Sequence, residues 1–111
     1  MTSLRAVGDA DFGDVVLGAV APVLVQFGAP GSTPCRQVGS MLEELAAELP
    51  DLAFTRLDVG AHPVTASAYG VTGLPTLLLF LEGRSVLSIV GARPKSVVRE
   101  LLLAALAGQA R

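Results

Sequence analysis

The sequence is poor in the residues from which most chemical sites are built. Its 111 residues include one cysteine, one histidine, one tyrosine and no tryptophan, and charged residues make up 16% of the chain. A single cysteine excludes an intramolecular disulfide, and one histidine far from it offers no set of metal ligands. We therefore expect neither a metal nor any other cofactor.

Charge and hydropathy exclude further classes of protein. The net charge is −2, and the eight lysines and arginines are scattered, so we expect no nucleic-acid partner. No apolar run approaches the roughly 18 to 20 residues that span a bilayer, which argues against a membrane segment. The first residues lack the basic and apolar regions of a secretory signal peptide, so we predict a cytoplasmic protein. The length predicts one domain over residues 1–111.

The hydrophobic periodicity alternates between strands and helices. Residues 22–27 are apolar except for Gln26, as in a strand covered on both faces. The early strand–helix–strand crossover requires a parallel pair, and a turn at residues 82–84 predicts an antiparallel hairpin. We expect strands at 3–7, 22–27, 52–59, 76–81 and 85–90, and helices at 9–18, from 33 to about 49, at 63–69 and at 94–107. This order predicts an α/β fold in which helices flank both faces of a mixed sheet.

The most informative motif lies between the strand at 22–27 and the following helix. Ser32 stands three positions before Cys35, with Pro34 between them. This is the layout of a dithiol redox site whose first thiol is a serine. Ser32 also suits a helix cap, worth about 1 kcal/mol, and Pro34 suits the first turn of a helix.

Five segments together resemble the thioredoxin family over nearly the whole chain. They are the strand at 23–27, the motif Pro34-Cys35-Arg36, the helix segment at 41–46, the loop and strand start at 69–77, and the loop at 90–92. The motif is similar to the second half of the family's Trp-Cys-Gly-Pro-Cys-Lys sequence. The resemblance implies a thioredoxin fold, with a five-stranded sheet in the order 1-3-2-4-5 and four flanking helices. It also implies a cis peptide bond between Leu74 and Pro75 that faces Cys35.

The family's chemistry requires groups that this sequence lacks. Disulfide exchange starts when a thiolate attacks a disulfide, and a second thiol then resolves the mixed disulfide. Here Ser32 occupies the attacking position, and only the resolving position, Cys35, carries a thiol. Gln26 stands where the family has a buried aspartate, and Gly28 and Gly31 stand where it has aromatic rings. We interpret the site as degenerate, with dithiol–disulfide reductase activity lost or strongly reduced.

Several of these residues have two interpretations. Cys35 is either a buried core residue or a lone reactive thiol, open to glutathionylation or to a bridge with a partner. Ser32 is either a helix cap or a donor to the Cys35 thiolate. We expect Gln26 to be a hydrogen-bonded core amide and His62 a surface cap residue. Arg56 and Asp58 are expected on a solvated or paired face, and the leucines of the last helix form in part a candidate interaction patch.

Two functional hypotheses follow, and they differ on whether the protein is an enzyme. In the first, the protein binds a protein or extended peptide at a groove that the resemblance places at Gly31, Leu74, Pro75, Val90 and Gly91, with strand addition at Leu74. In the second, it is a monothiol thiol–disulfide oxidoreductase that uses Cys35 in cell redox homeostasis. We expect a monomer or a weak homodimer.

Overall fold

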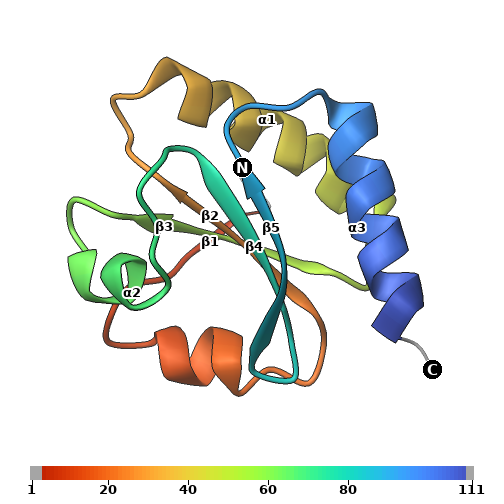
Figure 1. The fold of residues 1–111 in the computed structure, drawn as a ribbon, viewed down its shortest axis with the longest axis horizontal. Coiled ribbons are helices and arrows are strands. Elements are labelled where there is room, and N and C mark those ends of the chain that lie inside the picture. The colour runs from red at the N-terminus through yellow and green to blue at the C-terminus, as the bar shows by residue number, and fades with distance from the viewer. Residues whose placement is uncertain (1–3, 110–111) are drawn as a thin grey trace.

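A computed structural model describes residues 4–109 (Figure 1). The chain forms a sheet with helices on both faces. The elements are β1 (Arg5–Ala6), a short π-helix η1 (Gly13–Leu17), β2 (Val23–Gly28), α1 (Thr33–Glu48), β3 (Ala53–Asp58), α2 (Pro63–Ala68), β4 (Thr76–Leu81), β5 (Arg84–Val90) and α3 (Lys95–Gln109). Ser3, the first residue of the predicted opening strand, lies outside the described residues.

The sheet has the strand order β1-β3-β2-β4-β5, which confirms the predicted thioredoxin-type topology. β3 pairs in parallel with both β1 and β2, whereas β4 is antiparallel to β2 and to β5. β2 is buried along its whole length, as its apolar sequence predicts. The β4–β5 turn consists of Glu82 and Gly83, whose φ angles are 50° and 80°, so β5 begins at Arg84.

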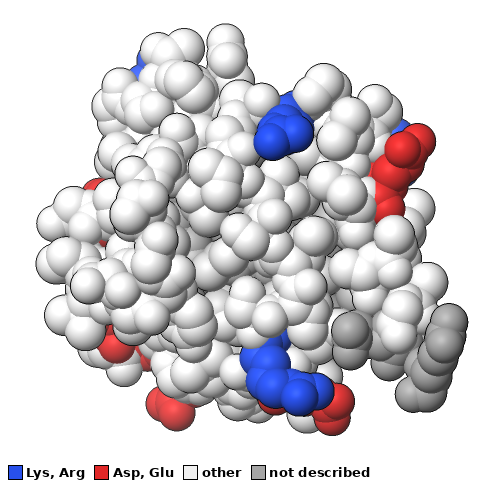
Figure 2. Space-filling model, in the orientation of Figure 1, with Lys and Arg blue, Asp and Glu red and all other residues white. Residues whose placement is uncertain are grey.

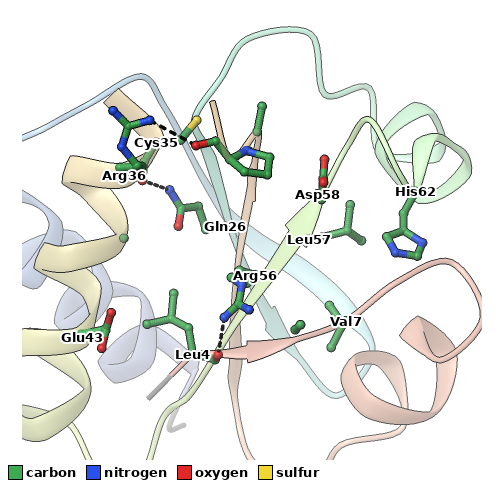
Figure 3. A pocket seen from close by; sticks show the side chains of 15 residues that line it. Leu4, Val7, Gln26, Cys35, Arg36, Glu43, Arg56, Leu57, Asp58 and His62 are labelled. Carbon is green, nitrogen blue, oxygen red and sulfur yellow. Dashed lines mark hydrogen bonds between the residues drawn. The ribbon is translucent and has the colours of Figure 1, made fainter. Parts of the chain in front are cut away.

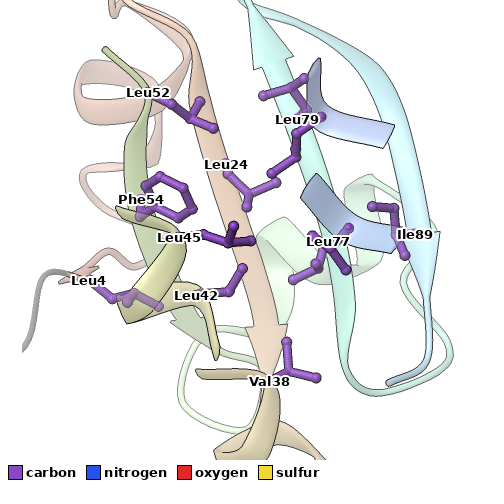
Figure 4. Packing of buried hydrophobic residues seen from close by; sticks show 12 residues of the cluster. Leu4, Leu24, Val38, Leu42, Leu45, Leu52, Phe54, Leu77, Leu79 and Ile89 are labelled. Carbon is purple, nitrogen blue, oxygen red and sulfur yellow. The ribbon is translucent and has the colours of Figure 1, made fainter. Parts of the chain in front are cut away.

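Each face of the sheet carries its own hydrophobic cluster. On one face, α1 and α3 cover a cluster that includes Leu42, Leu45 and Leu102, all fully buried (Figure 4). On the other face, η1 and α2 cover a cluster centred on Phe27 and Phe80. In the described part of the chain no helix is long and apolar enough to cross a membrane.

The N-terminal helix is shorter than predicted. The sequence predicts a helix from residue 9, with acidic side chains in its first turn, but η1 begins only at Gly13. The two acidic residues before it bond elsewhere. Asp11 accepts a hydrogen bond from the main-chain N–H of Gly8 at 2.8 Å. Asp9 faces α2, where it accepts hydrogen bonds from the N–H groups of Val64 and Thr65 at 3.2 and 2.8 Å.

His62 is the N-cap residue of α2, as the sequence predicts, but the capping hydrogen bonds are accepted by another residue. The His62 side chain makes no capping hydrogen bond. Its ring lies against Gly8, where any side chain would collide with it, and its Nδ1 accepts the N–H of Asp9 at 3.1 Å. The cap comes instead from Asp9, which is more than fifty residues away in the sequence.

This cap predicts a pH-dependent loss of stability in Asp9→Asn. Hydrogen bonds from Thr65, first from its side chain, hold the pKa of Asp9 below its ordinary value. A lowered folded-state pKa stabilises the fold above the unfolded-state pKa, and this contribution is lost as the pH falls through the folded-state value. We expect the variant to be less stable than the wild type at pH 7, with the difference shrinking below about pH 4.

Urea unfolding at a series of pH values measures this difference, with the exposed Asp51→Asn as the control. A difference that stays constant at every pH would show that Asp9 acts through its shape and not its charge.

Candidate functional site

Three loops meet at one edge of the sheet, and they carry the residues predicted for the binding groove. The register pairs Phe27 with Thr76 and Thr76 with Val90, so the end of β2, the start of β4 and the end of β5 lie together. The N–H of Gly91 donates to the carbonyl of Pro75 at 2.8 Å, which joins the second and third loops. The peptide bond between Leu74 and Pro75 is cis.

The exposed part of this edge is apolar. Leu74 is 38% exposed and Val90 53%, whereas Pro75 is buried. Gly31 is exposed, and a side chain there would meet nothing within 4 Å. Within residues 4–109, neither the N–H nor the carbonyl of Leu74 is hydrogen-bonded. We call Gly31, Leu74, Pro75, Val90 and Gly91 the loop face.

Ser32 is the N-cap of α1, as predicted. Its Oγ accepts the main-chain N–H of Cys35 at 3.3 Å, and Pro34 lies in the first turn. Among the described residues the Ser32 hydroxyl makes no hydrogen bond to the Cys35 sulfur. In this structure the serine therefore acts on the helix and not on the thiol.

Cys35 lies in the first turn of α1 and is only 6% exposed. Its sulfur sits against the main chain of Gly28 at the end of β2. A Cβ atom at residue 28 would be 3.0 Å from Sγ and 3.3 Å from the Cys35 Cβ, closer than side chains normally approach. The Cys35 sulfur can therefore lie at this position because residue 28 has no side chain.

Gln26 is the hydrogen-bonded core amide that the sequence predicts. It is 5% exposed, and its Nε2 donates to the carbonyl oxygen of Cys35 at 2.8 Å. This bond ties the first turn of α1 to the middle of the sheet. The other end of the amide, Oε1, faces α1 at Gly39, where a Cβ atom would lie 3.5 Å away.

A cavity of about 590 Å³ opens beside Cys35 (Figure 3). Its walls come from the first half of α1, the ends of β2 and β3, and the segment around β1. Polar and charged side chains contribute much of this lining, namely Gln26, Arg36, Glu43, Arg56, Asp58 and His62. The sequence predicts roles for Cys35, Gln26 and Gly28 in the motif, but it does not predict that they line a common cavity.

The two arginines of the cavity each donate a hydrogen bond to a main-chain carbonyl. Arg36 donates to the carbonyl of Pro30 at 3.2 Å and to the Thr33 hydroxyl at 3.1 Å, so it braces the loop before α1. Arg56 donates to the carbonyl of Leu4 at 2.9 Å. Arg56 is exposed, as predicted, and forms no ion pair with a described residue.

Glu43 and Arg56 were not predicted to belong to one site. Arg56 is brought to the site by the register of the sheet, because Arg56 of β3 pairs with Gln26 of β2. Both strands can be recognised in the sequence, but the residues that pair between them cannot. Within residues 4–109, no three histidine, cysteine, aspartate or glutamate side chains gather as metal ligands.

Comparisons with known proteins agree with the topology. The family model described as Thioredoxin matches residues 3–104. Thioredoxin 1 of Synechococcus elongatus is 38% identical over 103 residues, which cover 92% of this chain and 96% of that protein. Mycobacterium tuberculosis thioredoxin is 45% identical over 97 residues, covering 86% of this chain and 84% of its own. Mycolicibacterium smegmatis thioredoxin is 45% identical over 100 residues, covering 86% and 89%. The chain therefore belongs to the thioredoxin family.

Proposed function

We propose that this family member binds extended protein segments at the loop face and does not catalyse dithiol exchange. The observation that carries the proposal is the pair at the start of α1, where Ser32 caps the helix and Cys35 is the only cysteine of the chain. Resolution of a mixed disulfide needs a second thiol, and this chain has none to offer.

The loop face has the features that strand addition requires. Leu74 presents an unpaired N–H and carbonyl, which an extended peptide can use as a neighbouring strand would. Exposed side chains of Leu74 and Val90 flank these groups and offer apolar contacts. On the side of the molecule that shows β5 and the loop before β4, the middle of the surface carries no charge, with Lys or Arg side chains above and below it and acidic side chains toward the rim (Figure 2). This distribution favours apolar over charged segments.

The second candidate function is monothiol exchange at Cys35. It is favoured by one observation, which is that the buried thiol belongs to the wall of an open cavity. A partner thiol or a small-molecule thiol would then resolve the mixed disulfide in place of the missing second cysteine.

The wild-type protein should not accelerate the reduction of insulin by dithiothreitol. Ser32→Cys should restore only part of an ordinary thioredoxin's rate. Gln26 supplies no base, and general acid–base groups contribute roughly 10²- to 10⁴-fold, so we expect a deficit of about 10²-fold. Adding Gln26→Asp should reduce that deficit. An ordinary rate for the wild type would contradict the proposal, and an ordinary rate for Ser32→Cys alone would show that Gln26 is unimportant.

Leu74→Asp should weaken the binding of an extended peptide at the loop face. The alkylated B chain of insulin serves as the probe, with fluorescence anisotropy as the measurement. Loss of an apolar contact and burial of a charge should raise the Kd about tenfold or more, since burying a leucine contributes about 1.5–3 kcal/mol.

Val20→Asp is the matched control for this experiment. Val20 is 98% exposed, before β2 and outside the loop face, so its variant should bind like the wild type. Equal weakening by both variants, or no binding by the wild type, would argue against the loop face as the binding site.

A further inference from the structure

The loops that form the loop face carry a single charge. The three segments that meet there are residues 29–34, 70–75 and 90–94, and Arg93 is their only charged residue. It lies between the end of β5 and the start of α3, two positions after Gly91. An apolar surface with one charge at its margin can select an apolar segment and also the sign of a charge beside it.

The sheet places Arg93 beside the loop that carries Leu74. β4 and β5 are antiparallel neighbours, and the N–H of Gly91 donates to the carbonyl of Pro75 at 2.8 Å, so their alignment continues past the strand ends. Consecutive Cα atoms are about 3.8 Å apart, so the Cα atom of Arg93 lies within about 8 Å of that of Gly91. Because Pro75 adjoins Leu74, a segment that pairs with Leu74 passes within reach of the arginine side chain.

Arg93 is available to a partner, whereas the cations near it are engaged. It is exposed, and within residues 4–109 its side chain makes no hydrogen bond or ion pair. Lys95 pairs with Glu44 at 3.0 Å and with Glu48 at 2.6 Å. Arg36 donates to a carbonyl and a hydroxyl of the loop before α1. A carboxylate at Arg93 would therefore displace no partner among the described residues.

The acidic side chains of the neighbouring elements lie outside the three loops. Asp58 belongs to β3, which β2 separates from β4, and its Oδ1 accepts the N–H of Gly60 at 2.9 Å. Glu44 and Glu48 lie on α1 and hold Lys95. Figure 2 shows a positive side chain over the loop between β5 and α3, above the uncharged middle of the surface. The charge at this end of the loop face favours an acidic group on the partner.

We propose that Arg93 is a specificity-determining residue of the loop face, which selects extended apolar segments that carry a carboxylate near the residue held at Leu74. The main chain of the segment would pair with Leu74, and an apolar side chain would contact Leu74 and Val90. An aspartate or glutamate of the segment would pair with the guanidinium, which forms charge-assisted hydrogen bonds with carboxylates. This inference rests on the proposed function, because it names the partner class of the same surface.

The position of the acidic residue in the segment follows from strand geometry. Side chains two positions apart on a strand point to the same face, and they lie about 6.6 Å apart along the strand. This spacing is close to the largest separation between Gly91 and Arg93, about 8 Å. A carboxylate two positions from the apolar residue at Leu74 is therefore on the correct face and at the correct distance, on the side of the segment that passes the β5–α3 loop.

Blocked seven-residue peptides test this selection. The neutral parent has a central leucine between two valines, with a glutamine two positions from the leucine on each side. Four derivatives replace one glutamine or the other by glutamate or by lysine, and fluorescence anisotropy with a neutral dye measures each Kd. We expect one glutamate peptide to bind about fivefold more tightly than the parent, equivalent to about 1 kcal/mol, which is the upper end for exposed ion pairs. Lysine at that position should weaken binding, and the other glutamate peptide should bind like the parent.

Variants at residue 93 assign this preference. Arg93→Gln should remove the difference between the tighter glutamate peptide and the parent, and Arg93→Glu should transfer the preference to the corresponding lysine peptide. Arg84→Gln and Arg84→Glu are matched controls. Arg84 is also exposed, but it begins β5 at the end opposite to the loop face, so these variants change the net charge equally and should keep the wild-type preference.

Leu74→Asp separates failure of this inference from failure of the proposed function. Binding of the parent that Leu74→Asp weakens would identify the loop face as the peptide site. Equal Kd values for all five peptides in that case would overturn only the role of Arg93, and so would a glutamate preference that survives in Arg93→Gln. No binding of any peptide to the wild type would overturn the proposed function together with this inference.

Discussion

The close contact between the end of β2 and the first turn of α1 is the constraint on which the site depends. Gln26 donates to the Cys35 carbonyl at 2.8 Å, and the Cys35 sulfur rests on the main chain of Gly28. The hydrogen bond holds the first turn of α1 against β2. Gly28 leaves room for the Cys35 sulfur between the helix and the strand. Ser32 then fixes where the helix begins. The loop before α1, the buried thiol and the adjoining cavity all take their positions from this contact.

Much of the fold follows from local sequence. β4 occupies the predicted residues 76–81, because a short apolar run between a proline and a Glu-Gly turn has few alternatives. The cap of α1 was also predictable, since Ser32 lies within one turn of the group that it bonds. The cap of α2 was not predictable, because Asp9 is brought to it only by the folded chain. The cavity follows the same rule, since strand register and helix phase together place Arg56 opposite Glu43.

The sequence motif suggests a single site, but the structure has two separate surfaces near Cys35, the loop face and the cavity. The loop face is exposed and apolar, and it offers unpaired main-chain groups at Leu74. The cavity has a mixed lining that includes charged side chains of both signs, and it lies beside Cys35 between α1 and β3. A protein segment suits the first surface because strand addition uses main-chain hydrogen bonds. A small molecule suits the second because the cavity has a volume of about 590 Å³, within the usual range for small-ligand sites. The two can therefore operate without sharing a contact residue.

Gly28 determines where the Cys35 sulfur can lie. The resemblance to the family puts an aromatic ring at this position, and even a Cβ atom here would stand 3.0 Å from the Cys35 sulfur. A ring could return only if that sulfur moved. The present position of the thiol is thus tied to the glycine, because the sulfur fills the space that a side chain at residue 28 would need. The serine at position 32 accounts for the missing second thiol, and the glycine at position 28 accounts for where the remaining thiol lies.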